Sequence, residues 1–224
     1  MLEFLDEMFD SETIKPSFEY VHIVLALYIF GKQEEGMGRY RLQKELEIGS
    51  GTARSLITKL KEKMEFLTVL GDNNRKGHIL TQKGAQYLTK LKTKIPLLEP
   101  VDIGKLKDII IEPDNNKAYI CVVCDASERI TSGITQRDAA IKIGGLGATC
   151  LIYEGEHLRF PVKSFSAAEQ AQLMVEEPIQ SYFETIANEN ESALSEGDVI
   201  IIGLGETSKL ARLSAMNAAL TLIT

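Results

Sequence analysis

The sequence predicts an α+β protein of two domains that divide near residue 97. The first 96 residues place apolar side chains at helical spacing, whereas the later residues alternate short β-branched runs with helical ones. The segment 94–104 contains Pro96 and Pro100, which cannot continue a helix, and the net charge changes sign there. We therefore expect a helix-rich domain over 1–96 and a small mixed α/β sandwich over 97–224.

Composition limits the classes of protein to consider. The 224 residues are 44% hydrophobic and 25% charged, which is ordinary for a globular protein with an ample core. Three cysteines and no secretory leader favour a reducing, cytoplasmic setting over a disulfide framework. The longest apolar run, residues 21–30, is about half the length that spans a bilayer. We therefore expect no membrane partner.

Charge is distributed unevenly along the chain, whose formal net charge is −7. Residues 1–37 carry 2 Lys against 8 acids, residues 38–94 carry 13 Lys or Arg against 5, and residues 95–224 carry 10 against 19. The segment charges are therefore −6, +8 and −9. A basic block between acidic ones is typical of a polyanion-binding module, although a solvated helical face is the alternative.

The first domain is predicted to contain helices, a hairpin and a final helix. An acidic amphipathic lead-in ends before Pro16, and Ser17 is expected to cap a helix over 18–30. A short helix over 39–47 precedes a longer one that starts near Ser50 as its cap. The longer helix carries a clean apolar stripe: Ala53, Leu56, Ile57, Leu60 and Met64.

The hairpin follows directly. "EFLTVLG" and "HIL" are predicted strands around the turn-rich loop "DNNRKG", and Thr81 is expected to cap the last helix. Together these elements form a winged helix-turn-helix. "RYRLQKELEIGSGTARSLITKLKEK" resembles the paired helices of bacterial and archaeal winged-helix repressors. "FLTVLGDNNRKGHILTQKG" resembles their wing, with the LT-x-KG entry to the final helix typical of MarR-like families.

The resemblance covers about 60 residues, 38–94. The whole chain also resembles uncharacterised archaeal proteins that join a winged helix to a small α/β domain, which implies no activity for the second half. The resemblance and the basic block together predict binding to double-stranded DNA.

Candidate DNA contacts fall into three groups. Short hydroxyls and an Arg near the start of the second helix suit base edges, the preceding helix suits phosphates, and the wing tip suits a minor groove. Glu62 departs from this pattern, because an acid on the outward face should lie beyond the phosphates or weaken binding. The candidates are Ser50, Thr52, Arg54, Ser55, Thr58 and Lys59; Arg39, Arg41 and Lys44; and Arg75 and Lys76.

The second domain is predicted to alternate strands and helices. Strands are expected over 107–112, 117–125 and 197–205, with a hairpin over 148–161 around Gly155. Helices are expected over 135–145, over 166–190 with an interruption at Pro178, and over 206–223. The Gly-rich turn 144–149 is expected to end the first of these helices.

A strand-to-helix turn at Gly203–Leu204–Gly205 is the candidate ligand site of this half. Its free backbone N–H groups could bind an anion, although a tight turn before an ordinary Thr207 or Ser208 cap is the alternative. If strands 119–124 and 198–202 are adjacent and parallel, Asp125 shares the same sheet edge. The candidate ligand-binding residues are Asp125, Gly203, Gly205, Glu206 and Thr207.

Catalytic and metal sites are not expected. Cys121 and Cys124 lie three apart on a strand, so their side chains point to opposite faces, and Cys150 is also on a strand. The sequence shows no Ser–His–Asp arrangement, Walker-type loop or His cluster. We therefore expect no enzyme and no cofactor; a nucleotide or phosphate enzyme at the Gly203 turn is the less favoured alternative.

The sequence thus predicts a cytoplasmic, DNA-binding transcriptional regulator that acts as a homodimer. The second domain is expected to bind a small-molecule effector or to dimerise, and an effector would change the placement of the two winged helices. The lead-in and the helix at 17–30 could supply the dimer surface. The alternative is a winged-helix protein-interaction module with an α/β dimerisation domain.

Overall fold

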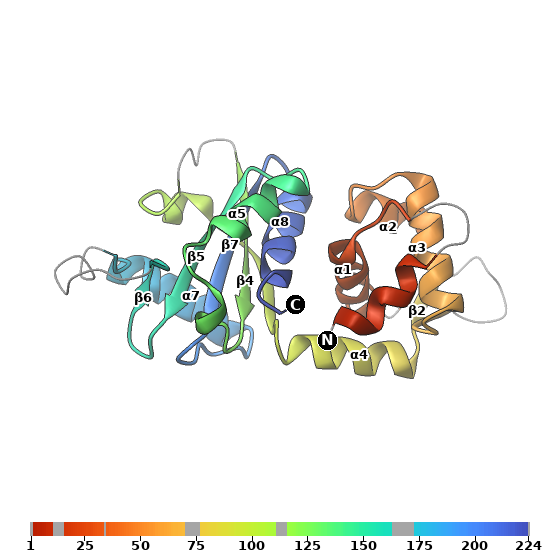
Figure 1. Cartoon of the computed structure of the whole chain (residues 1–224), viewed down its shortest axis with the longest axis horizontal. Coiled ribbons are helices and arrows are strands. Elements are labelled where there is room, and N and C mark those ends of the chain that lie inside the picture. The colour runs from red at the N-terminus through yellow and green to blue at the C-terminus, as the bar shows by residue number, and fades with distance from the viewer. Residues whose placement is uncertain are drawn as a thin grey trace. The chain divides into compact units, whose positions relative to one another are not determined.

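The computed structural model describes residues 2–10, 16–33, 35–69, 77–110, 116–162 and 173–223. The chain divides into two compact units, Met1–Leu91 and Lys92–Thr224 (Figure 1). The predicted division after residue 96 falls directly before the first strand of the second unit. Within the described residues, no helix combines the length and the apolar character needed to cross a membrane.

The first unit has the predicted order of helices, hairpin and helix. Strands β1 and β2 pair antiparallel, with Leu67 opposite Leu80. Residues 70–76, which join them, lie outside the described residues. The elements are η1 (Leu2–Phe9), α1 (Tyr20–Gly31), α2 (Arg39–Glu45), α3 (Ser50–Glu62), β1 (Leu67–Val69), β2 (His78–Leu80) and α4 (Gln82–Lys92).

Helix α3 has the amphipathic pattern that its sequence predicts. The inward side chains recur every three or four residues, which places them on one face of the helix. The predicted cap is wrong, because Gly49 occupies the N-cap position and Ser50 is already helical. Every member of the apolar stripe is buried: Ala53, Leu56, Ile57, Leu60 and Met64.

Helix α1 is apolar almost all round and is buried, as a central helix should be. Its cap is Glu19 rather than Ser17. The Glu19 side chain accepts the backbone N–H of His22, and His22 Nδ1 accepts the Glu19 N–H at 2.9 Å. The Ser17 hydroxyl instead lies 2.6 Å from the Thr52 hydroxyl.

The lead-in forms the 3₁₀ helix η1 and packs on its own chain. Its apolar residues Leu2, Leu5 and Met8 are buried. The ring of Phe9 lies 4.6 Å from that of Tyr20, centroid to centroid. Phe4 of the same segment is 47% exposed, and the prediction that the lead-in helps to form a dimer surface stays a prediction.

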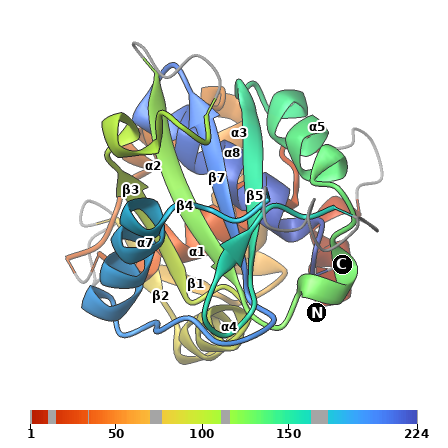
Figure 2. The ribbon, with the colours of Figure 1, turned by 90° about the vertical axis from the view of Figure 1, so that its left-hand side faces the viewer.

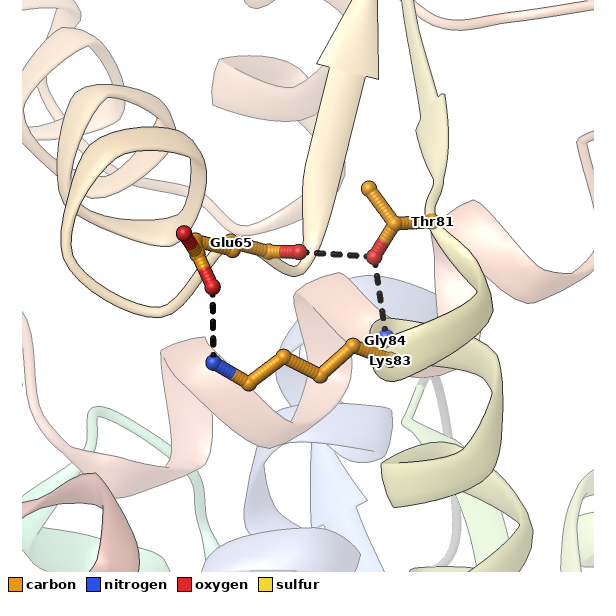
Figure 3. Close-up of polar contacts among 4 residues, drawn as sticks. All are labelled: Glu65, Thr81, Lys83 and Gly84. Atoms are coloured by element: carbon orange, nitrogen blue, oxygen red, sulfur yellow. Dashed lines mark hydrogen bonds and ion pairs between the residues drawn. The ribbon is translucent and has the colours of Figure 1, made fainter.

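The LT-x-KG motif joins the hairpin to α4 through three contacts (Figure 3). The Thr81 hydroxyl donates to the Glu65 carbonyl at 2.7 Å and accepts the Gly84 N–H at 3.1 Å, which is the predicted cap. Lys83 Nζ lies 3.1 Å from the Glu65 carboxylate. A Cβ at Gly84 would lie 2.3 Å from the Phe66 carbonyl oxygen, so only glycine fits there.

The second unit is built around a five-stranded sheet in the order β3-β4-β7-β5-β6, and all neighbouring strands are antiparallel. The strands are β3 (Leu97–Val101), β4 (Lys117–Val123), β5 (Gly147–Tyr153), β6 (Leu158–Arg159) and β7 (Val199–Gly205). The helices are η3 (Ile103–Leu106), η4 (Ser127–Arg129), α5 (Ile134–Lys142), α7 (Glu177–Glu189) and α8 (Ser208–Leu220).

Helices cover both faces of this sheet, which agrees with the predicted mixed α/β sandwich. Helix α7 places Ile179, Phe183 and Ala187 against one face (Figure 2). Helices α8 and α5 pack on the other face, over β7, β4 and β5. The central strand β7 is buried throughout, which explains its continuous apolar sequence.

Two of the secondary-structure predictions for this unit are wrong. Residues 107–110 of the expected strand form a turn, and 111–112 lie outside the described residues. The strand is instead β3, in the Pro-containing segment interpreted as a boundary. Pro100 is tolerated because β3 is an edge strand, which needs no second set of ladder bonds. Pro178 lies in the first turn of α7 and does not interrupt it.

Candidate nucleic-acid interface

A groove of about 410 Å³ runs along the first unit between α2, α3 and the start of β2. It brings together charged side chains that are far apart in the sequence. Among the described lining residues, three of the four charged ones are basic, which gives this part of the groove a positive balance. The lining residues are Gly38, Arg39, Tyr40, Arg54, Ile57, Thr58, Lys61, Glu62, Gly77 and His78.

Helix α3 supplies most of the chemistry of the groove. Arg54, Thr58 and Glu62 follow one another at four-residue spacing, so they lie along one face of the helix, and all three are exposed. Lys61 lies three residues after Thr58 and also lines the groove. The sequence places Thr58 and Glu62 on the outward face with Arg54 flanking it, which agrees with the exposure of these three side chains.

Helix α2 contributes a cation stacked on an aromatic ring. The Arg39 guanidinium lies 4.8 Å from the centroid of the Tyr40 ring and donates a 3.0 Å hydrogen bond to its hydroxyl. Tyr40 is 67% exposed, the largest exposed fraction among the large hydrophobic side chains of the described residues. Arg41 and Lys44 are exposed on α2 but do not line the groove.

Four other predicted contacts of α3 lie outside the groove. Ser50 is exposed and Ser55 is half-buried, but neither lines it. Thr52 is held by Ser17. Lys59 Nζ donates to the carbonyls of Met8 and Asp10, both at 2.8 Å, so this ammonium caps the end of η1.

The environment of Lys59 agrees with a structural role, in which its ammonium binds the N-terminal segment of the same chain. Burial, followed by the charge of neighbouring Lys63, lowers the pKa of Lys59. Lys63 Nζ also donates to backbone oxygens of this segment, at 3.2 Å to Glu7 and 3.0 Å to Asp10. These two lysines therefore hold the N-terminal segment on α3.

Lys61, Tyr40 and His78 line the groove but are not among the contacts predicted from the sequence. Lys61 follows Arg54 by seven residues, so helical periodicity alone could have identified it. Tyr40 and His78 come to the groove only through the fold, because Met37 and His78 form a β-bridge that brings the start of α2 to the hairpin. Arg75 and Lys76, the predicted wing-tip contacts, lie outside the described residues.

His78 lies beside the charged side chains of the groove. Burial, followed by the Lys61 ammonium, lowers the pKa of His78. Its Nδ1 atom is buried and has no hydrogen-bond partner among the described residues. The groove therefore keeps its charge from Arg39, Arg54, Lys61 and Glu62.

The predicted anion-binding turn of the second unit is wrong. Gly203 and Gly205 are buried within β7 rather than in a turn. A Cβ at Gly203 would lie 2.1 Å from the backbone nitrogen of Ala215, and one at Gly205 would lie 2.5 Å from that of Ala211. Both glycines are needed because α8 approaches the strand closely.

The other members of that predicted site are also separated. Because β4 and β7 are antiparallel, Lys117 pairs with Gly205 while Val123 pairs with Val199, so Asp125 lies at the opposite end. Its backbone N–H donates to the Asp198 carboxylate at 3.1 Å. Thr207 caps α8 by accepting the Leu210 N–H at 3.1 Å, as the alternative prediction stated, and Glu206 is exposed beside it.

The cysteines are free thiols. Cys121 and Cys150 lie on the central strands, whereas Cys124 lies in the turn after β4, so the prediction that it belongs to the strand is wrong. Cys121 and Cys150 both pair with Ile201, so they lie on the same face with one strand between them. Burial raises the pKa of Cys150 to about 12, and burial also raises the pKa of Cys121. Among the described residues, no cluster of His, Cys, Asp or Glu side chains is suited to a metal ion.

Comparison with known proteins supports the fold and names no activity. A family model described as a domain of unknown function (DUF4443) matches residues 114–222. A solved structure, a hypothetical protein from Pyrococcus horikoshii OT3, is similar with a TM-score of 0.63 and 26% identity, covering 92% of this chain and 93% of that chain. None of the curated proteins compared with the chain matches it. The resemblance to winged-helix repressors therefore stays a prediction.

Proposed function

We propose that the chain is a DNA-binding transcriptional regulator whose first unit is a winged helix-turn-helix. The observation that carries this proposal is the groove in which Arg39, Arg54 and Lys61 meet at the outward face of α3. An exposed helix with basic and hydroxyl side chains on one face suits a major groove. The block from residue 38 to 94, with a net charge of +8, supplies the long-range attraction.

The groove residues take different roles in this proposal. Arg54 and Thr58 contact base edges, and Arg39 and Lys61 contact phosphates on either side. Thr52 and Lys59 are not assigned a DNA contact, because the Thr52 hydroxyl is bonded to Ser17 and the Lys59 ammonium to the Met8 carbonyl at the end of η1. Arg41 and Lys44 remain candidates for phosphate contacts, and Ser50 and Ser55 for base edges. Arg75 and Lys76, which lie outside the described residues, remain candidates for a minor groove.

One winged helix contacts few base pairs, so we propose that the protein binds a palindromic site as a homodimer. The second unit is then the dimerisation or effector-binding part. Sedimentation of the full chain at DNA-binding concentrations should give a dimer. A monomer that binds one half-site would contradict the dimer and leave the DNA contacts standing.

The groove also favours a second candidate function, the binding of a protein partner. Tyr40 is 67% exposed, and Glu62 introduces a negative charge that a phosphate backbone would repel. Exposed aromatic side chains beside arginine are frequent anchors of protein interfaces. The two functions differ in how binding responds to duplex DNA and salt.

The test is a fluorescence anisotropy titration of the full chain with a random-sequence duplex at several salt concentrations. Arg39→Gln and Lys61→Gln should each weaken binding and lower the salt slope by about one. Lys92→Gln removes the same charge from α4, away from the groove, and should retain most of the affinity. Absence of duplex binding by the unaltered chain at low salt would refute the proposal and favour the protein partner.

A further inference from the structure

A second cavity lies entirely within the α/β unit. It has a volume of about 380 Å³ and is formed by the start of α5, the middle of β5 and the segment after β6. Pockets of this size, mainly apolar with a few polar groups, are typical sites for small ligands. None of the ligand-binding residues predicted from the sequence lines it.

The walls of this cavity are mostly apolar. Ile134, Ala148, Phe160 and Pro161 all line it, and Ile134 is 53% exposed. Isolated apolar side chains are common at protein surfaces, but here they surround a hollow. An apolar group of modest size would cover them and remove that surface from water.

Among the described residues that line the cavity, Arg137 is the only charged one. Its Nε and Nη2 atoms bond to the Asp138 carboxylate at 3.0 and 2.8 Å, which fixes the orientation of the guanidinium. No described residue forms a hydrogen bond with its Nη1 atom. Ser132 and Thr149 also line the cavity, and a hydroxyl such as that of Ser132 is a suitable donor to an oxygen ligand.

The start of α5 adds further donors at the same end. Gly133 occupies the N-cap position with a φ of 73° and provides no side-chain cap. The first backbone N–H groups of a helix have no acceptor within the helix and favour a negative group. The charge, the Ser132 hydroxyl and these N–H groups therefore all favour a small anion, whereas the walls favour an apolar body.

From this combination we infer that the cavity binds a small monocarboxylic acid with an apolar body. The carboxylate lies against Arg137 Nη1 and the Ser132 hydroxyl, and the apolar body packs between Phe160, Pro161 and Ile134. The inference does not depend on DNA binding, so the two proposals can fail separately.

The test uses benzoate as the probe and benzyl alcohol as its uncharged counterpart. Backbone amide NMR spectra of the full chain are recorded while each compound is added at millimolar concentration. We expect benzoate to shift the amide signals of Gly133, Thr149 and Cys150, and benzyl alcohol to shift them much less. No shift with benzoate, or an equal response to both compounds, would overturn the inference.

Two variants and a control locate the binding. Arg137→Gln should weaken benzoate about tenfold, because it removes one charge-assisted hydrogen bond. Ala148→Leu fills part of the cavity and should also weaken it, while keeping the arginine. Lys142→Gln removes a charge from the same helix outside the cavity and should bind benzoate as the unaltered chain does. Unchanged affinity in the Arg137 variant, with a normal melting temperature, contradicts the site.

Discussion

The hydroxyl of Thr81 lies 2.7 Å from the backbone carbonyl of Glu65, and it joins the end of α3 to the start of α4. The same hydroxyl accepts the Gly84 N–H, so one side chain serves two backbone groups. Thr81→Ala should lower the free energy of unfolding by about 1–2 kcal/mol, because both bonds are lost. Urea denaturation measures this change.

Thr81→Ser should retain most of the stability, since the serine hydroxyl can make both bonds. Thr89→Ala is a matched control within α4, where the hydroxyl only bonds back to the Ala85 carbonyl. That change should be close to neutral. A Thr81→Ala protein as stable as the unaltered chain would show that the junction is held by other contacts.

Substitution by alanine should change the stability in opposite directions at two helical glycines. Gly84 lies in α4 against the Phe66 carbonyl, so Gly84→Ala should destabilise by about 1–3 kcal/mol through overpacking. Gly51 lies in α3 with nothing within 4 Å of an added Cβ, so Gly51→Ala should stabilise by about 0.5 kcal/mol. Thermal denaturation of both variants checks the sign of each change, and equal signs would contradict the packing described.

Stability should decrease in acid because of His22. Burial is the main cause that lowers the pKa of His22 below its usual 6.5, so the folded chain binds fewer protons than the unfolded chain as pH falls below about 6.5. The same pKa direction holds for His78. Protonation of His22 Nδ1 would also remove the acceptor for the Glu19 N–H.

Melting temperatures between pH 7 and pH 5 measure this effect. His22→Asn should show a smaller decrease over this range than the unaltered chain, although it starts from lower stability. His157→Gln is the control, because His157 is exposed on the loop between β5 and β6. Equal acid sensitivity in all three proteins would mean that His22 is not the group that titrates.

Glu62 should limit the affinity for DNA. It lies in the groove with Arg54 and Lys61, so its negative charge opposes a phosphate backbone. Glu62→Gln should tighten binding to any duplex by up to about tenfold at low salt, with a smaller gain at high salt. Anisotropy titrations at two salt concentrations measure it. Glu128→Gln, the same change in the second unit, should leave affinity unaltered, and a weaker Glu62→Gln complex would contradict the proposed position of the duplex.

Local sequence patterns predicted the elements well where one physical rule dominated. The α3 stripe, the Thr81 and Thr207 caps, and the continuous apolar run of β7 each follow from periodicity or capping preference. The Ser17 cap failed because Glu19 and His22 form a reciprocal pair two residues later. Prolines in β3 resembled a linker because the sequence does not show that the strand lies at an edge.

The sites were harder to predict than the elements. Placing Asp125 beside Gly205 required the direction of β4 relative to β7, which neither strand encodes by itself. The pairing of Lys59 with the carbonyls of Met8 and Asp10 joins residues about fifty positions apart. The cavity at Arg137 likewise combines α5, β5 and the segment after β6, which only the tertiary fold brings together.

In the proposed function, the exposed face of α3 reads duplex DNA through Arg54. Selection of binding sites from random duplex DNA by the full chain, repeated with Arg54→Ala, tests it most directly. We predict that the unaltered chain enriches one motif and that Arg54→Ala loses preference at specific positions while still binding duplex. Failure of the unaltered chain to enrich any sequence, or the same motif from both proteins, would contradict the claim.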